Sequence, residues 1–283
     1  MSIKTRAVLV KFTDSVWQGG MIDSNVGLEV QDAHKALVNT GHYWKRLVPK
    51  SAIRPRANAG NAARNFHIAN TLPWMDGGTR ILPVANFDTY MAGMRKLITA
   101  AQKEESKLFA DYAGWKDEAK RTHGSLFNET HFPTLAQLRG KFGIDIDVIP
   151  LPNVTDWRVD LSDEQMDAVR QRAEDKINSI HREGVVELYQ RLSDMVEKVK
   201  ERLSDPEATF RDSLIKNIRD FTTLIPKLNI SDDKQLEAVR KDVEKNIAAM
   251  APEDLRADPV ARSKVAKHAA DICKKMSGYM TTK

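Results

Sequence analysis

The sequence predicts a mainly α-helical protein: an elongated antiparallel helical bundle built on two long helices, with a small β-hairpin and an irregular N-terminal α+β lobe. Two apolar stripes at helical spacing, within 88–121 and 161–203, are the main observation. Pro and Gly residues crowd the segment 45–86, which is typical of loops. These patterns divide the chain into a lobe at 1–86 and a helical part at 87–283.

The N-terminal lobe is expected to hold little regular structure. Ala7–Val10 lies in a run of β-forming residues and indicates a short strand, and Glu29–Val38 indicates a short helix that ends at Gly41. Within the loop-rich segment that follows, only Ala62–Asn70 is predicted to be helical.

The first long helix is predicted to begin at Asp88, a favourable N-cap, and to continue to about Arg121. A short helix is expected at Thr134–Phe142. Apolar residues then alternate with Asp145 and Asp147, and a second alternating run ends at Leu161, so the chain should form a β-hairpin at 144–161.

The second long helix has the clearest signals. Ser162 and Gln165 have the spacing of a capping box, and apolar residues recur about every 3.7 positions from Met166 to Leu203. This period favours a straight or slightly right-handed seam over a left-handed coiled coil. Facing the stripe against that of the first long helix would bury both, so we expect the two helices to form the antiparallel pair.

Three helices are expected after this pair. Asp205, followed by Pro206, predicts a helix that ends near Pro226. A second helix is predicted at Asp232–Met250, and a third begins with Asp258 and Pro259.

The composition is that of a soluble globular protein, with 29% charged and 41% hydrophobic residues and a mean hydropathy of -0.47. No stretch resembles a signal peptide or a membrane-spanning segment. Cys273 is the one cysteine, so no internal disulfide can form. We expect a cytoplasmic protein.

The candidates for catalysis and metal binding are weak. His123, Glu129 and His131 are close enough in sequence to share an ion, but a solvated connection also explains them. A carboxylate cluster could hold magnesium, although exposed strand positions and caps account for its members: Asp145, Asp147, Asp156, Asp160 and Asp163. No glycine-rich nucleotide-binding motif is present. The sequence therefore predicts no metal, no cofactor and no enzymatic activity.

The N-terminal lobe carries the better functional signal. Up to Trp74, ten basic residues oppose four acidic ones, within a chain of net charge +5. Aromatic residues interleaved with cations suit stacking on bases and contacts to phosphates. The candidate nucleic-acid-binding residues are Tyr43, Trp44, Lys45, Arg46, Lys50, Arg54, Arg56 and Arg64. The aromatic residues could instead form the core of the lobe, and the cations could dock an acidic partner or a neighbouring subunit.

The segment Pro-Leu-Pro-Asn-Val-Thr-Asp-Trp-Arg-Val-Asp-Leu at 150–161, together with Phe210–Asn217 and Leu228–Ile230, resembles DUF3150. This is an uncharacterised family of phage and mobile-element proteins, and the similarity covers roughly Asp88–Met280. It implies a setting near recombination proteins, MoxR-like AAA+ ATPases or von Willebrand-type partners. The family has no active-site motif to transfer, so the resemblance assigns no catalytic residue.

We therefore expect a non-enzymatic phage or mobile-element scaffold protein, present in the cytoplasm of the host cell. It should form homo-oligomers and bind DNA or RNA through its basic lobe, in a recombination or replication setting. The alternative is a protein–protein adaptor or inhibitor that acts on an AAA+ ATPase or on a host protein, such as a defence protein, through its helical surface. Salt dependence separates the two, because phosphate contacts release counterions and an apolar interface does not.

Overall fold

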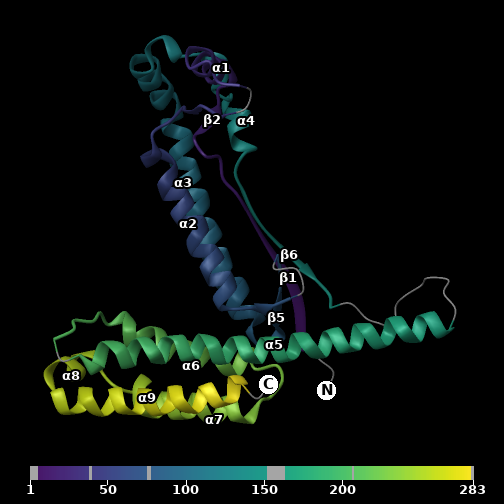
Figure 1. Ribbon diagram of the computed structural model, residues 1–283, viewed down its shortest axis with the longest axis vertical. Helices are drawn as coiled ribbons and strands as arrows, with labels where there is room; N and C mark the ends of the chain where they lie inside the picture. The colour runs from purple at the N-terminus through teal and green to yellow at the C-terminus, as the bar shows by residue number, and fades with distance from the viewer. Residues whose placement is uncertain (1–5, 38–39, 75–77, 152–162, 206, 282–283) are drawn as a thin grey trace. The chain divides into compact units, whose positions relative to one another are not determined.

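The structure is a computed structural model, and it describes residues 6–37, 40–74, 78–151, 163–205 and 207–281 (Figure 1). It confirms a mainly α-helical chain with a small antiparallel sheet. The residues group into two compact units. Unit 1 consists of Met1–Lys11, Asn70–Asp88 and Val148–Lys283, and unit 2 consists of Phe12–Ala69 and Thr89–Asp147. The sequence predicts a single boundary between residues 86 and 87. The two units are instead interleaved along the chain, which passes from one unit to the other four times.

Unit 1 is built around the long helix α5, Asp163–Ser204, whose apolar stripe packs against α9, Pro259–Thr281, and α6, Ser213–Leu228. Figure 1 shows α5 running alongside both of these helices. Buried residues of the stripe include Ile180, Leu188, Leu192, Val199 and Leu203, as the periodicity predicts. The remaining helical elements are α7, Lys234–Val243, a π-helical turn at Glu244–Ala248, and α8, Pro252–Ala257.

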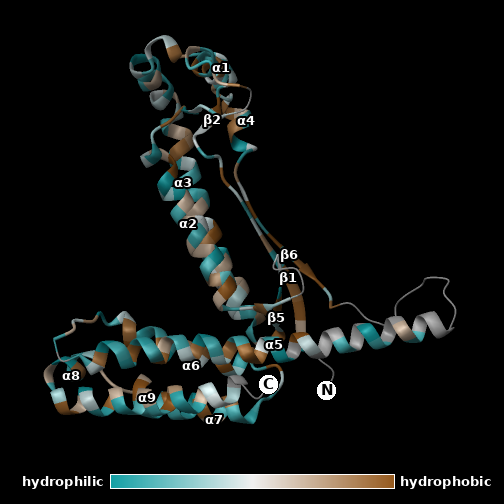
Figure 2. Ribbon diagram, in the orientation of Figure 1, coloured by the Kyte–Doolittle hydropathy of each residue, from teal (hydrophilic) through white to brown (hydrophobic). Residues whose placement is uncertain are grey.

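The larger sheet has the strand order β4-β5-β1-β6. Strand β1 pairs antiparallel with β5, with Leu9 opposite Ile81, and β5 pairs antiparallel with β4. Figure 2 shows hydrophobic residues along β1 and β6. The strand bounds are Ala7–Ser15 for β1, Leu72–Pro73 for β4, Thr79–Pro83 for β5 and Gly143–Ile149 for β6.

Unit 2 contains α1, Ser24–Ala33, α2, Lys50–Ala69, the long helix α3, Phe87–Thr122, and α4, Leu135–Arg139. Strands β2, Gly20–Ile22, and β3, Trp44–Arg46, pair antiparallel and form a two-stranded ribbon. Unit 2 also contains three-residue 3₁₀ turns at Gly124–Leu126 and Glu129–His131, while the 3₁₀ turn at Val84–Asn86 belongs to unit 1. The core of unit 2 includes Trp17, Leu47, Leu108, Tyr112 and Leu138.

The structure does not confirm the predicted pairing of the two long helices. The α5 stripe is buried in the core of unit 1 by α9 and α6. Buried residues of α3, such as Leu108 and Tyr112, belong to the separate core of unit 2. Periodicity identifies the face that a helix buries, but any apolar surface of suitable shape can cover that face.

The segment 45–86 is less irregular than predicted. Helix α2 begins at Lys50, directly after Pro49, and continues through Pro55. A proline inside a helix removes one backbone hydrogen bond and crowds the preceding turn. Here α2 nevertheless buries Ile53 and Ala63, and this packing outweighs the local cost.

Two further predictions change at the C-terminal side of the long helices. Asp205 does not start a helix: α6 begins at Ser213, and the Arg262 side chain donates to carbonyl groups of this connection instead. The first arm of the predicted β-hairpin forms as β6, which lies next to β1. The second arm, which ends at Leu161, and the predicted cap Ser162 lie outside the described residues.

Candidate functional site

The β2–β3 ribbon presents two of the candidate residues to solvent. Its antiparallel register places Met21 opposite Lys45, so Lys45 is the central residue of β3. Its side chain is buried, and Nζ lies 3.0 Å from Asp23 Oδ2. Successive side chains of a strand point to opposite faces. Trp44 and Arg46 are therefore exposed on the other face, with 47% of Trp44 accessible.

Asp23 connects this ribbon to α1. Its Oδ1 accepts a hydrogen bond from the Val26 backbone at the start of α1, and its own N–H donates to the Tyr43 carbonyl. The hydrogen bond from Lys45 holds the pKa of Asp23 below its usual value. His131 Nδ1 lies 3.1 Å from Lys45 Nζ, on the same buried side. These contacts fix β3, and thereby the position of Trp44.

Helix α2 supplies the other wall of the candidate site. Lys50 is its first residue, and Arg54 follows four positions later on the same face. The ribbon and α2 together line a solvent-open hollow of about 670 Å³. We call it the Trp44 hollow; its lining residues are Gln18, Trp44, Arg46, Lys50, Ile53, Arg54, Ala57 and Asn58.

The electrostatic character of the Trp44 hollow is uniformly basic. Arg46, Lys50 and Arg54 are exposed, and none of the described residues that line the hollow is acidic. The sequence contains no aspartate or glutamate between Asp32 and Asp76. The three cations are therefore not neutralised by neighbours along the chain, and they can attract an anionic ligand.

The structure brings together four of the eight predicted residues, namely Trp44, Arg46, Lys50 and Arg54. Tyr43 is half-buried beside them in sequence, but does not line the hollow. Arg64 is exposed further along α2, with its guanidinium 5.4 Å from the centre of the Phe12 ring. Arg64 therefore lies outside the candidate site.

The prediction that Lys45 and Arg56 bind nucleic acid needs correction. Lys45 is 4% exposed and pairs with Asp23, while Arg56 is fully buried. The Arg56 Nη2 and Nε atoms donate to Asp14 at 2.8 Å and to Glu105 at 2.6 Å. Burial disfavours the Arg56 charge, but these hydrogen bonds outweigh it and raise the pKa of Arg56. Both cations are used inside the protein, so neither can contact a phosphate.

Sequence reasoning missed Gln18, Gly20 and Asn58. Gln18 and Asn58 line the hollow with side-chain amides, and Gly20 lies against the Trp44 ring. The spacing of Lys50, Arg54 and Asn58 is the available signal, because these positions share one face of a helix. This spacing points to a shared face only once the helix α2 is known to begin at Lys50.

The weaker sequence candidates do not form a metal site in the part of the chain that the structure describes. No group of three possible metal-binding side chains occurs there. His131 contacts Lys45, and Glu129 pairs with Lys116 at 2.7 Å. Asp145 and Asp147 lie on β6. Asp156 and Asp160 lie outside the described residues, as does the side chain of Asp163.

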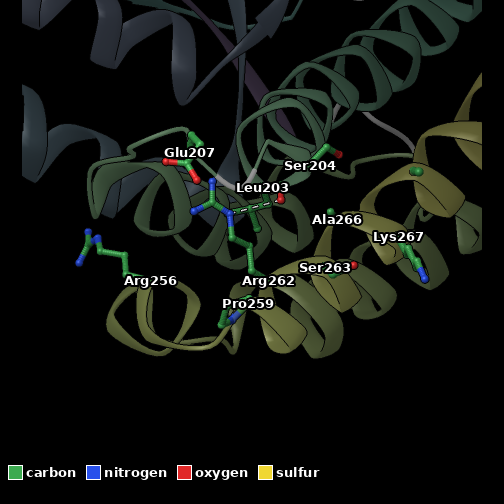
Figure 3. Close-up of a pocket in the computed structure, with 10 residues that line it drawn as sticks. Leu203, Ser204, Glu207, Arg256, Pro259, Arg262, Ser263, Ala266 and Lys267 are labelled. Atoms are coloured by element: carbon green, nitrogen blue, oxygen red, sulfur yellow. Dashed lines mark hydrogen bonds between the residues drawn. The ribbon is translucent and has the colours of Figure 1, made fainter.

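A second hollow, of about 500 Å³, lies between the end of α5 and the start of α9 (Figure 3). Figure 3 shows Arg262 pointing toward Leu203, whose carbonyl accepts a hydrogen bond at 3.3 Å. The Arg262 guanidinium also donates to the carbonyls of Arg202 and Ala208. Arg262 thus serves to satisfy the last carbonyls of α5, which have no partner within that helix.

No protein-family model, curated protein or solved structure matches this chain. Within the described ranges, no helix is both long enough and apolar enough to span a membrane.

Proposed function

We propose that the protein binds nucleic acid through the Trp44 hollow, as a non-enzymatic, mainly helical scaffold. The observation that carries this proposal is the placement of Arg46, Lys50 and Arg54 around an exposed tryptophan, with no acid among the lining residues that the structure describes. Arginine and lysine are the side chains that most often contact phosphate oxygens. The positive end of the α2 dipole, at Lys50, adds to their attraction for an anion.

The buried ion pairs support the same proposal. Two of the four acids that precede Trp44 in the sequence, Asp14 and Asp23, form ion pairs with Arg56 and Lys45. Their negative charges are therefore compensated inside the protein, which leaves the positive charges of the hollow to dominate its surface. The resemblance to DUF3150, with its recombination setting, is compatible with this role and remains a prediction.

The proposal is tested by fluorescence anisotropy with a labelled oligonucleotide of about 16 nucleotides and its duplex. The variant R46A/K50A/R54A should bind at least about tenfold more weakly at low salt. If each cation contacts one phosphate, the slope of log K against log salt should fall in magnitude by about 2 for a single strand.

The matched control is R95A/K96A/K103A, which removes three exposed cations from α3 in the same unit. It changes the net charge by the same amount, so the effect of total charge is separated from that of position. Equal losses in both variants would contradict a site at the Trp44 hollow. Absence of wild-type binding at about 50 mM salt would contradict the function itself.

A second candidate function is protein docking, and a specific observation favours it. Helix α1 buries none of its residues, and Leu28 is 57% and Val30 49% exposed. Exposed apolar side chains of this kind occur at protein interfaces. An adaptor role toward an AAA+ ATPase or host protein, or self-association, would weaken in L28D/V30D and persist in R46A/K50A/R54A. Light scattering of both variants, alone and with the candidate partner, separates these roles.

A further inference from the structure

We infer, resting on the proposed function, that the Trp44 hollow takes an unpaired base of single-stranded DNA or RNA, stacked on the Trp44 indole. Tryptophan is among the largest apolar residues, and 47% of Trp44 is open to solvent at the wall of a hollow. Aromatic side chains beside cations are the usual platforms for bases in single-strand-binding proteins.

Trp44 is held in place before any ligand binds. A Cβ atom added to Gly20 would lie 2.9 Å from both Cε2 and Cζ2 of Trp44, and 2.5 Å from the Lys45 carbonyl oxygen. The indole thus packs directly against the backbone of β2. Because the Lys45–Asp23 ion pair also anchors β3 from the buried side, little side-chain freedom remains to be lost on stacking.

The surroundings fit one nucleotide and its neighbouring phosphates. A hollow of about 670 Å³ has the size of a small-molecule pocket. Arg46 lies two residues from Trp44 in β3, while Lys50 and Arg54 come from α2, so cations flank the indole from two elements. The amides of Gln18 and Asn58 can each donate and accept hydrogen bonds at a base edge. Such amides accommodate different bases, so base preference should be weak.

A duplex cannot use this platform without opening. Paired bases are stacked on one another and expose only their edges in the grooves. The three cations can still contact duplex phosphates, but the indole then contributes nothing. The structure therefore predicts a selective contribution of Trp44 to single strands, added to a charge contribution that both forms share.

The test compares the wild type with W44L, W44F and the control L28A, which removes an exposed apolar side chain on α1. Each is titrated with a mixed-sequence single strand and its duplex by anisotropy at two salt concentrations. W44L should lose about five- to a hundredfold in single-strand affinity, with an unchanged salt slope and unchanged duplex affinity. W44F, which retains an aromatic ring, should recover most of the loss, and L28A should match the wild type.

The two proposals fail in different ways. If W44L binds single strands as the wild type does, or loses single-strand and duplex affinity equally, while R46A/K50A/R54A abolishes both, base stacking is refuted and nucleic-acid binding stands. If the wild type binds neither form at low salt, both proposals are refuted. Circular dichroism of each variant verifies that the fold is retained.

Discussion

Replacing Arg56 with methionine should destabilise the protein severely. Arg56 is 0% exposed, and its guanidinium joins Asp14 of β1 to Glu105 of α3. The side chains of these acids are only 8% and 15% exposed. Methionine fills a similar volume but carries no charge. The substitution would therefore leave two carboxylates close together in a poorly solvated site, without the cation that compensates them.

The magnitude follows from this geometry. Removing one partner of a buried ion pair typically costs about 3 to 5 kcal/mol, because the remaining charge stays desolvated. The free energy of unfolding of a domain is about 5 to 15 kcal/mol, so R56M should remove a large fraction of it. The matched control is R54M on the same helix, where the side chain is exposed. R54M should change stability by no more than about 0.5 kcal/mol.

Urea denaturation followed by circular dichroism measures both effects. The midpoint should fall sharply for R56M and remain near the wild-type value for R54M. The triple variant R56M/D14L/E105L, in which all three charges are replaced, should recover much of the lost stability, since no unpaired charge remains. Equal midpoints for R56M and R54M would refute the assignment of Arg56 as an internal residue, as would loss of nucleic-acid binding without loss of stability.

Two further outcomes concern titratable groups. The hydrogen bond from Lys45 lowers the pKa of Asp23 in the folded state. The pair therefore stabilises the folded protein at pH values above the ordinary aspartate pKa of 3.8. This stabilisation is lost as the pH falls through the lower pKa of the folded state. Acid titrations of stability should show a smaller decline below about pH 4 in D23N/K45M than in the wild type; identical slopes would contradict the coupling. Burial raises the pKa of the Cys273 thiol to about 12. Alkylation of Cys273 at about pH 8 should then be at least a hundredfold slower in the native protein than in denaturant. Similar rates in the two conditions would show that the thiol is accessible to the reagent and that its pKa is not raised.

Local patterns predicted the long helices well. The periodicity that ends at Leu203 corresponds to α5, and the start predicted at Asp88 is one residue from the start of α3 at Phe87, so that Asp88 lies in the first turn of the helix and is not its N-cap. Both signals are local, because a helix is defined by hydrogen bonds between residues four apart. The prolines at 49 and 55 misled the prediction for α2, since the packing that compensates Pro55 comes from residues distant in sequence.

The candidate site was predicted in part. Trp44, Arg46, Lys50 and Arg54 were identified from composition, and the structure places them around one hollow. The cations that do not belong to it could not be recognised from sequence alone. The partner of Arg56 on α3 lies 49 positions away, and no local pattern indicates such a contact.

The sequence by itself determined the two long helices and where positive charge is concentrated, because backbone periodicity and residue type are local properties. Only the tertiary structure decided that α5 packs against α9, and that Lys45 and Arg56 form internal ion pairs. A charged side chain becomes structural or functional according to the groups that surround it. Those groups come from other elements, and folding alone brings them together.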